Sequence, residues 1–343
     1  MEFNSFRQMV RLRAPRDLEP EEQYVEYRED PLTGGRCRIN VKRIQRPRQG
    51  QGAADIGEIA GRTKDCPFCP DNIDDEAPSF LVDVLPEGHL KKGECLLFPN
   101  LYPLARCHAV AILTVGHYLT LEGFVPRMVA DNLACAVEFA RAVHHGDGES
   151  AYPIYIWNHL PPSASSIVHP HTQVIIDSRP TRYQELLLTA SSEYHRRHGS
   201  SFWKDVVAME RREARRYVGG NDSMEIIASF APQGNREVQF IFRDASSLAD
   251  LEDEQIEDFA DAVIRVFRGY DKMGVSSFNV CTFSGPVGEK LPHYSLHVKI
   301  ISRPPVQAFY RNDSGPLERL HHEPDIEMEP EAMAEALKPF FGE

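Results

Sequence analysis

The stretch SASSIVHPHTQVIID, residues 163–177, places two histidines on either side of a proline and a glutamine two residues later. If the segment is a β-strand, the side chains of His169, His171 and Gln173 project from one face, because successive side chains alternate. A half-buried strand does not ordinarily gather imidazoles on one face. The pattern therefore indicates either a functional site or an edge strand with a solvated polar face, which Pro170 permits.

The length and composition are those of a folded globular protein. A chain of 343 residues with 42% hydrophobic content can bury a sizeable core in two domains or one enlarged domain. No long apolar run and no signal-peptide pattern occurs, so neither membrane insertion nor export is predicted. Seven cysteines form an odd, scattered set, which favours a reducing compartment over a disulfide framework. We expect a cytoplasmic protein.

The charge balance is acidic, with 38 basic against 51 acidic residues and a net charge of −13. This balance disfavours nucleic-acid binding, which depends on a broad basic surface. An anionic substrate would have to be met by local cations. Lys42, Arg43, Arg46 and Arg48 form one such cluster, although a short basic run is also typical of a plain solvated surface.

The order of expected elements is repeated along the chain. Residues 95–115 predict strand, turn and strand, residues 125–145 an amphipathic helix, and residues 152–158 and 169–177 two further strands. The same order recurs in residues 226–244, 253–273, 276–285 and 293–304. Aligning residues 102–103 with 231–232 gives an offset of 129, and aligning His169 with His297 gives 128. We interpret this as a duplicated α+β unit.

The repeat suggests a division of the chain into three parts. Residues 1–177 form the first unit and residues 223–343 the second. Residues 178–222, which are rich in charge and have apolar residues at helical spacing, are expected to form a helical linker between them.

A metal site is indicated by Cys66 and Cys69, whose C-x-x-C spacing lets two thiolates bind one zinc ion. Zinc needs two further ligands, for which His117 and His169 are the candidates. His108 is less suitable, because it lies in the middle of a predicted strand. A thioredoxin-like redox pair or two inert thiols are the alternatives, but the redox motif requires a preceding strand that the sequence lacks.

Taken together, these motifs resemble the galactose-1-phosphate uridylyltransferase family of the histidine-triad (HIT) superfamily, in which two triad-like units occur in one chain. The resemblance runs from about Arg28 to Lys299. It is carried by REDPLTGGRCRINVKRIQRPRQG, CPFC, FPNLYP, VGHYLTL and WNHLPPSASSIVHPHTQ. The last motif is the most specific, and the others gain weight from their order.

The resemblance implies a fold, a cofactor and a set of site residues. The fold would be α+β, with two tandem HIT-like units, each a mainly antiparallel sheet with packed helices, joined by a helical linker. The protein would be a homodimer with a role in galactose metabolism. Zinc would be bound by Cys66, Cys69, His117 and His169, His171 would be the nucleophile, the nucleotide would be contacted by Asn100, Asn158, Ser166 and Gln173, and Arg43 would lie near the phosphates.

The residue types agree with nucleotidyl transfer. A neutral imidazole can attack an α-phosphorus and later leave it near pH 7. The Gln173 amide can donate a hydrogen bond to a non-bridging oxygen in the transition state. We therefore expect a ping-pong uridylyltransferase acting on UDP-glucose and a hexose 1-phosphate, such as galactose 1-phosphate, through a uridylyl-His171 intermediate.

The second half departs from the family pattern. Where members of the family have a His-x-His pair at a second metal site, this chain has His297-Val298-Lys299, so the second metal is expected to be absent. Lys299 either replaces the positive charge or is a surface lysine at a strand end. The segment that grips the hexose phosphate also differs. Two alternatives therefore stand: an adenylyl-transferring phosphorylase acting on ADP-glucose or a dinucleoside polyphosphate, and a non-catalytic zinc module that binds a nucleotide or a partner protein.

Overall fold

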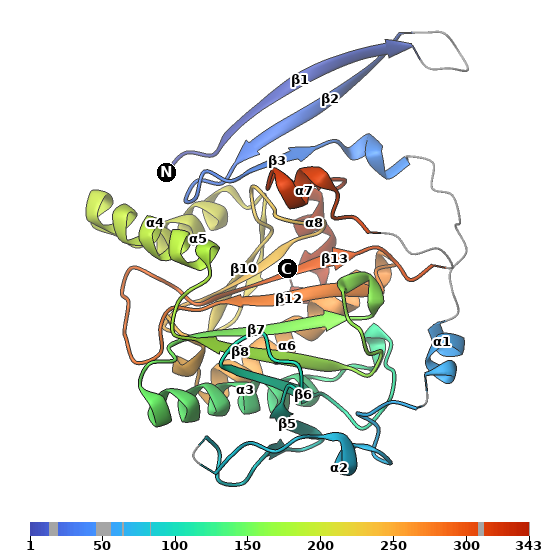
Figure 1. The fold of residues 1–343 in the computed structure, drawn as a ribbon. Helices are drawn as coiled ribbons and strands as arrows, with labels where there is room; N and C mark the ends of the chain where they lie inside the picture. The colour runs from blue at the N-terminus through green and yellow to red at the C-terminus, as the bar shows by residue number, and fades with distance from the viewer. Residues whose placement is uncertain (14–19, 46–55, 64, 83, 308–311, 343) are drawn as a thin grey trace.

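The computed structural model describes residues 1–13, 20–45, 56–63, 65–82, 84–307 and 312–342, which fold into a ten-stranded sheet and a four-stranded sheet (Figure 1). The strands of the large sheet, in spatial order, are β4 (Leu90–Lys92), β5 (Cys95–Pro99), β6 (Cys107–Ile112), β8 (His171–Asp177), β7 (Tyr152–His159), β12 (Ser277–Phe283), β13 (His297–Arg303), β11 (Val238–Phe242), β10 (Met224–Ile227) and β9 (Tyr217–Gly220).

The small sheet has the order β1 (Asn4–Arg13), β2 (Pro20–Glu29), β3 (Arg36–Ile39) and β14 (Asp325–Ile326). The β1–β2 hairpin extends away from the body of the molecule (Figure 1). The helices are α1 (Ile56–Arg62), α2 (Ile73–Glu76), α3 (Pro126–Asp147), α4 (Arg182–His198), α5 (Phe202–Glu213), α6 (Asp253–Lys272), α7 (Pro316–Leu320) and α8 (Pro330–Phe341), with short 3₁₀ turns η1 (Val41–Gln45), η2 (Leu121–Gly123), η3 (Pro161–Ser163) and η4 (Leu248–Asp250).

The two halves of the large sheet repeat one arrangement. Strands β6, β8 and β7 with helix α3 match strands β11, β13 and β12 with helix α6, and all the neighbouring strands concerned are antiparallel. Strand β7 of the first half pairs with β12 of the second, and this pairing joins the halves into one continuous sheet. At this seam between the halves, Asn158 lies opposite Asn279. The predicted α+β class with two tandem units is therefore confirmed.

The strand registers correct the alignment of the repeat. Strands β8 and β13 each have seven residues and the same alternation of buried and half-buried side chains. Ile112 pairs with His171 in the first half, and Ile241 pairs with His297 in the second. His297 is therefore the counterpart of His171, and not of His169 as the offset of 128 suggested. Lys299 then stands in the place of Gln173.

The interpretation of the opening stretch as an edge strand is wrong, because β8 lies between β6 and β7. The expected alternation holds only from His171 onward, where β8 begins. His169 precedes the strand, and the carbonyl of Pro170 accepts a hydrogen bond from the backbone N–H of Leu113. This separation allows His169 to turn away from the sheet while His171 stays on its face.

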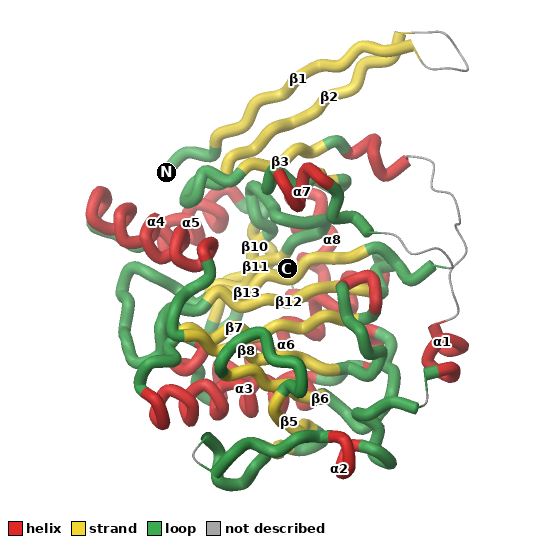
Figure 2. Tube along the Cα trace, viewed as in Figure 1, coloured by secondary structure: helices red, strands yellow, loops and turns green. Residues whose placement is uncertain are grey.

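Helices α3 and α6 pack against each other and cover one face of the large sheet (Figure 2). Pro126 in the first turn and Gly148, with φ of 62°, bound α3 as helix-start and helix-stop residues. The core at the seam is aromatic, with the ring of Phe267 5.4 Å from that of Trp157 and 4.6 Å from that of Phe278. Each fully buried ring of this kind contributes about 2–3 kcal/mol through apolar burial.

The other face of the large sheet carries the half-buried residues of β7, β8, β12 and β13. Helices α4 and α5 lie over the end of this face where β13 begins (Figure 1). There Trp203 of α5 packs on His297, with ring centroids 4.1 Å apart. Within the described ranges, no helix is long and apolar enough to cross a bilayer.

Candidate active site and metal centre

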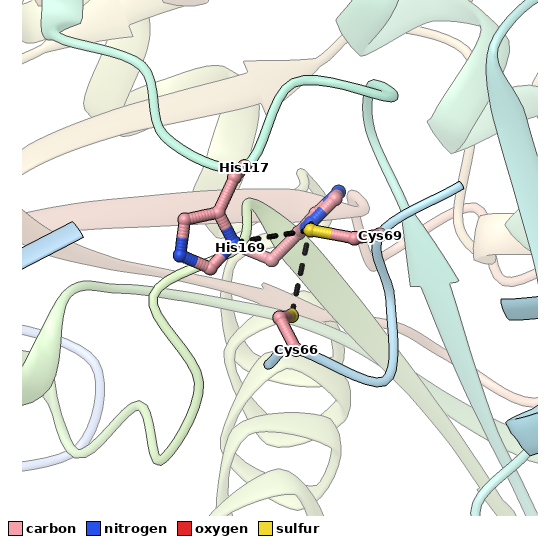
Figure 3. Close-up of side chains that lie close together, drawn as sticks. All are labelled: Cys66, Cys69, His117 and His169. Atoms are coloured by element: carbon pink, nitrogen blue, oxygen red, sulfur yellow. Dashed lines mark hydrogen bonds between the residues drawn. The ribbon is translucent and has the colours of Figure 1, made fainter. Parts of the chain in front are cut away.

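The four residues predicted to bind a metal come together beside the start of β8. Cys66 and Cys69 lie on the turn before α2, His117 follows β6, and His169 precedes β8 (Figure 3). Their ligand atoms all lie within 4.8 Å of one another. The Nδ1 atom of His169 is 3.9 Å from Sγ of Cys66 and 3.7 Å from Sγ of Cys69, and Nδ1 of His117 is 3.3 Å from the latter sulfur.

The hydrogen bonds of the two imidazoles fix which nitrogen faces the sulfurs. Nε2–H of His169 donates to the carbonyl of Thr114 over 2.7 Å, which leaves Nδ1 with its lone pair. Nε2 of His117 lies 2.9 Å from Oγ1 of Thr63, whose own hydrogen is donated to the carbonyl of Ala60. Both rings therefore present Nδ1 toward the sulfurs, while Nε2 contacts Thr63 or the Thr114 carbonyl. A hydrogen bond from the other ring nitrogen is usual for metal-bound histidines.

The donor set fits a tetrahedral metal ion. Two sulfurs and two imidazole nitrogens around such an ion stand about 3.3–3.8 Å apart for bond lengths typical of zinc, and the three separations above span 3.3–3.9 Å. Burial and the neighbouring Cys66 raise the pKa of Cys69 to about 11. Deprotonation of this thiol at neutral pH therefore requires a cation, which a bound metal supplies.

His171 is held as an acceptor beside this cluster. Its Nδ1–H donates to the carbonyl of His169 over 2.8 Å, so the lone pair is on Nε2. The side chain is 6% exposed, and Phe68 packs edge-on against it with centroids 5.3 Å apart. Burial lowers the pKa of His171, while the bond to the carbonyl raises it, and the net shift is downward. The imidazole is therefore neutral at physiological pH.

Gln173 lies on the same face of β8, and its amide is oriented by a residue that the sequence did not identify. The backbone N–H of Leu104 donates to Nδ1 of His108 over 3.0 Å, which leaves the hydrogen on Nε2. Nε2–H then donates to Oε1 of Gln173 over 2.8 Å. Burial lowers the pKa of His108, so the ring stays neutral in this tautomer. The NH₂ group of Gln173 is thereby left to donate elsewhere.

Asn158 stands beside His171 in the sheet. Trp157 pairs with Thr172, so the next residues along the two antiparallel strands are Asn158 and His171. The Asn158 side chain accepts a 2.6 Å hydrogen bond from Nδ2 of Asn279. Asn279 also donates to the carbonyl of Ser163 over 2.9 Å. Asn279 was not predicted as a site residue, because it lies in the second half of the chain.

The loop before β8 has a strained backbone. Leu160 has φ of 69° and Ala164 has φ of 70°, in the left-handed region that residues with a Cβ rarely adopt. Such strain persists only where surrounding structure holds it, and it concentrates at functional sites. Ser166 lies in this loop and is exposed.

The remaining predicted residues lie around this centre. Asn100 follows β5, where its Oδ1 accepts from the N–H of Tyr102 and its Nδ2 lies 3.2 Å from Nε2 of His108. It therefore belongs to the neighbourhood of Gln173.

Arg43, by contrast, lies in η1 and forms an ion pair with Asp325 of the small sheet. Among the described contacts, none joins Arg43 to His171, Asn158 or Gln173. Arg46 and Arg48 lie outside the described residues.

Comparison with solved structures finds the same fold in proteins of known structure. An ADP-glucose phosphorylase from Arabidopsis thaliana with bound ADP-glucose matches with a TM-score of 0.71, at 17% identity over 92% of this chain and 98% of that one. A uridylyltransferase matches with a TM-score of 0.67, at 22% identity over 92% and 98% of the two chains. The resemblance to the galactose-1-phosphate uridylyltransferase family is confirmed at the level of the fold.

At the level of sequence, the chain is 31% identical over 326 residues to an uncharacterized protein from Archaeoglobus fulgidus, and the match covers 94% of each. The chain belongs to one family with this archaeal protein. No family model matches the sequence.

Proposed function

We propose that the protein is a nucleotidyltransferase that moves a uridylyl group between UDP-glucose and a hexose 1-phosphate by a ping-pong mechanism. The observation that carries this proposal is the orientation of His171. Its Nδ1 is committed to the His169 carbonyl, and its neutral Nε2 is left with a lone pair. A nucleophile of this kind, next to an oriented amide donor, is suited to attack on phosphorus.

The two half-reactions follow from these groups. Nε2 of His171 attacks the α-phosphorus of the donor, the bond from that phosphorus to the bridging oxygen breaks, and glucose 1-phosphate leaves. A phosphate oxygen of the incoming hexose 1-phosphate then attacks the same phosphorus, and the imidazole leaves with its electron pair. The NH₂ group of Gln173, whose Oε1 is held by His108, donates to a non-bridging oxygen in both steps.

We propose zinc as the metal at the Cys66, Cys69, His117 and His169 cluster, because thiolate and imidazole ligands suit zinc better than harder ions. All four positions are protein ligands, which is the composition of a structural site. Its role is to hold the segment that leads into β8 and hence to aim His171. Elemental analysis of the purified protein should show about one zinc per chain and no stoichiometric iron; a second tightly bound metal would contradict this assignment.

The alternative is that the transferred group is adenylyl rather than uridylyl. The solved structure that matches with a TM-score of 0.71 is an ADP-glucose phosphorylase. The roles proposed for His171 and Gln173 concern the phosphate and not the base. In that reading the acceptor is inorganic phosphate, and the nucleophile and the amide keep their roles. A dinucleoside polyphosphate would be a further donor of the same class.

The test is to incubate the protein with UDP-glucose or ADP-glucose, each radiolabelled at the α-phosphate, and to measure label bound covalently to the protein. We expect label from UDP-glucose, discharged on addition of galactose 1-phosphate. Label from ADP-glucose alone, discharged by inorganic phosphate, would establish the adenylyl alternative. Absence of label from both would favour a non-catalytic zinc module and overturn the proposed chemistry.

We further propose a cytoplasmic homodimer that acts in galactose metabolism. The β1–β2 hairpin supports self-association, because it carries exposed apolar side chains at Phe6, Val10 and Tyr24. Light scattering of the purified protein should give twice the chain mass of 38.9 kDa. A monomer at micromolar concentration would contradict the dimer without affecting the proposed reaction.

A further inference from the structure

The second half of the chain reaches the first-half site through Asn279 and Arg303. Asn279 lies on β12, directly opposite Asn158 of β7. Arg303 ends β13, and its Nη1 donates to Oδ1 of Asn279 over 3.0 Å. Asn279 in turn donates from Nδ2 to Oδ1 of Asn158 over 2.6 Å. Three side chains on three adjacent strands therefore form one hydrogen-bonded row that ends beside His171.

The direction of every bond in this row is fixed by the arginine. A guanidinium has donors and no acceptor, so the atom of Asn279 that faces it must be the oxygen. The NH₂ group of Asn279 then faces Asn158 and the carbonyl of Ser163, which is also an obligatory acceptor. Asn158 must consequently present its oxygen to Asn279. Its own NH₂ group is turned away from the seam and has no acceptor within the described part of the chain.

Arg303 is itself held in place by the segment after β13. Its Nη2 lies 2.7 Å from Oδ1 of Asp313 and donates to Oδ1 of Asn312 over 3.1 Å. The side chains of Arg303 and Asp313 are 15% and 20% exposed, so this pair is largely shielded from solvent. These contacts hold the guanidinium beside Asn279.

We infer that Arg303 and Asn279 are positioning residues for the nucleotidyl-transfer site: they fix the amide of Asn158 so that its NH₂ group donates to the phosphate of the bound nucleotide. The inference rests on the proposed function. It gives the second half a part in the reaction that needs no metal there. Asn158 and Gln173 then play equivalent parts beside His171. The oxygen of Gln173 accepts a hydrogen bond from His108, and the oxygen of Asn158 accepts one from Asn279.

The test is a double-mutant cycle on kcat/KM for the donor nucleotide, with Asn158→Ala and Asn279→Leu alone and together. We expect each single variant to lower kcat/KM about tenfold, and the double variant to be no worse than Asn158→Ala, because Asn279 acts only through Asn158. Equal losses that multiply in the double variant would overturn the inference, as would wild-type kinetics for Asn279→Leu.

Arg303 supplies a second measurement that does not depend on how Asn279→Leu folds. Arg303→Lys keeps a group that can only donate and should retain most of kcat/KM, whereas Arg303→Gln can present either an oxygen or an NH₂ group and should lower it. Zinc content of all variants should stay at the wild-type value. Arg303→Gln should lower the melting temperature, because Asp313 loses its counter-ion, so kcat/KM is measured well below the melting temperature of every variant. Equal effects of lysine and glutamine would contradict the role of bond direction. A wild-type protein that takes label from neither donor would overturn the proposed function together with this inference, whereas failure of the cycle in a labelled protein overturns the inference alone.

Discussion

His171 and His297 begin equivalent strands in the two halves of the large sheet, and both are oriented in the same way. Nδ1 of His171 bonds the carbonyl two residues before it over 2.8 Å, and Nδ1 of His297 bonds the corresponding carbonyl of Ser295 over 3.0 Å. Each ring is thus left with a lone pair on Nε2. The duplicated strand therefore reproduces the geometry of an acceptor imidazole, and the difference between the halves lies in what surrounds it.

The place beside His171 is polar, and the place beside His297 is aromatic. Phe283 pairs with His297 across β12 and β13, where the first half has Asn158, and its ring stacks on the imidazole at 4.9 Å. Trp203 of α5 packs on His297 at 4.1 Å, so rings on two neighbouring elements enclose it. The cavity lined by His297 and Lys299 is about 30 Å³, which is room for about two water molecules. A nucleotide cannot enter it.

The oriented amide of the first half is replaced by an ion pair in the second. His108 and Gln173 correspond in register to Glu237 and Lys299. Burial alone would lower the pKa of Lys299, but Glu237, whose carboxylate lies 3.0 Å away, raises it overall. The side chain of Lys299 is 11% exposed, so the interpretation of Lys299 as a surface residue is wrong. Around His297 and Lys299 the strand face therefore serves packing and stability.

The largest expected effect separates the two histidines by activity. Replacing His171 with glycine should lower kcat by at least about 10³-fold, because the nucleophile is lost while all four metal ligands remain. Replacing His297 with glutamine should leave kcat unchanged. Steady-state kinetics with metal analysis on both variants checks this. Activity of the His171 variant within about tenfold of wild type would contradict covalent catalysis.

The next effect concerns the metal. His169→Ala should abolish most metal binding and lower the melting temperature at the same time, because a structural metal site contributes directly to folding. His297→Gln is the matched control and should keep its metal. Elemental analysis and thermal unfolding of the two variants decide the point. A His169 variant that keeps one metal per chain would remove this residue from the ligand set.

A smaller effect compares the two polar pairs. His108→Phe should lower kcat about tenfold, because Gln173 is then free to turn its oxygen toward the substrate. Glu237→Gln should leave kcat unchanged but reduce the free energy of unfolding by about 3–5 kcal/mol, because the buried Lys299 loses its counter-ion. Denaturant unfolding and kinetics on both variants test this division. A reversed pattern would show that the second-half pair acts in catalysis.

The smallest effect is a pH dependence of the free energy of unfolding, caused by Glu210, which lines the cavity beside His297. Glu210 is fully buried, and this burial raises its pKa to about 7 against the opposing effect of Arg216. A carboxyl whose folded pKa is raised binds a proton more tightly when folded, so the free energy of unfolding falls as pH rises from the unfolded value of about 4.5 to about 7. Glu210→Gln should remove this part of the slope. An unchanged slope in denaturant titrations from pH 5 to 7 would contradict it.

Much of the fold and part of the candidate site could be predicted from the sequence, because these features depend on residues that are close together in the chain. The order of strands and helices, the C-x-x-C pair and the alternation from His171 onward depend on short-range patterns. The four residues of the candidate metal cluster could be named from the sequence, because thiols at C-x-x-C spacing and histidines are typical of metal sites. The fold followed from the order of the motifs and from the repeat.

The residues that the sequence missed depend on long-range register. His108 lies opposite β8 in the sheet, 65 positions before Gln173, and a lone histidine in an apolar strand does not reveal its partner. Asn279 reaches Asn158 over 121 positions. Equating His297 with His169 failed because β8 begins two residues later than the histidine pair suggests. The placement of Arg43 near the phosphates stays a prediction; in the structure its guanidinium forms an ion pair with Asp325.

The most direct test of the account is to map the covalent label. Wild-type protein is incubated with the α-labelled nucleotide sugar that modifies it, digested under conditions that preserve phosphoramidates, and the labelled peptide is identified by mass spectrometry. We expect about one label per chain, on His171, and none on the peptide that contains His297. Label on His297, or undiminished label in the His171→Gly variant, would contradict the claim that only the first half of the sheet carries the chemistry.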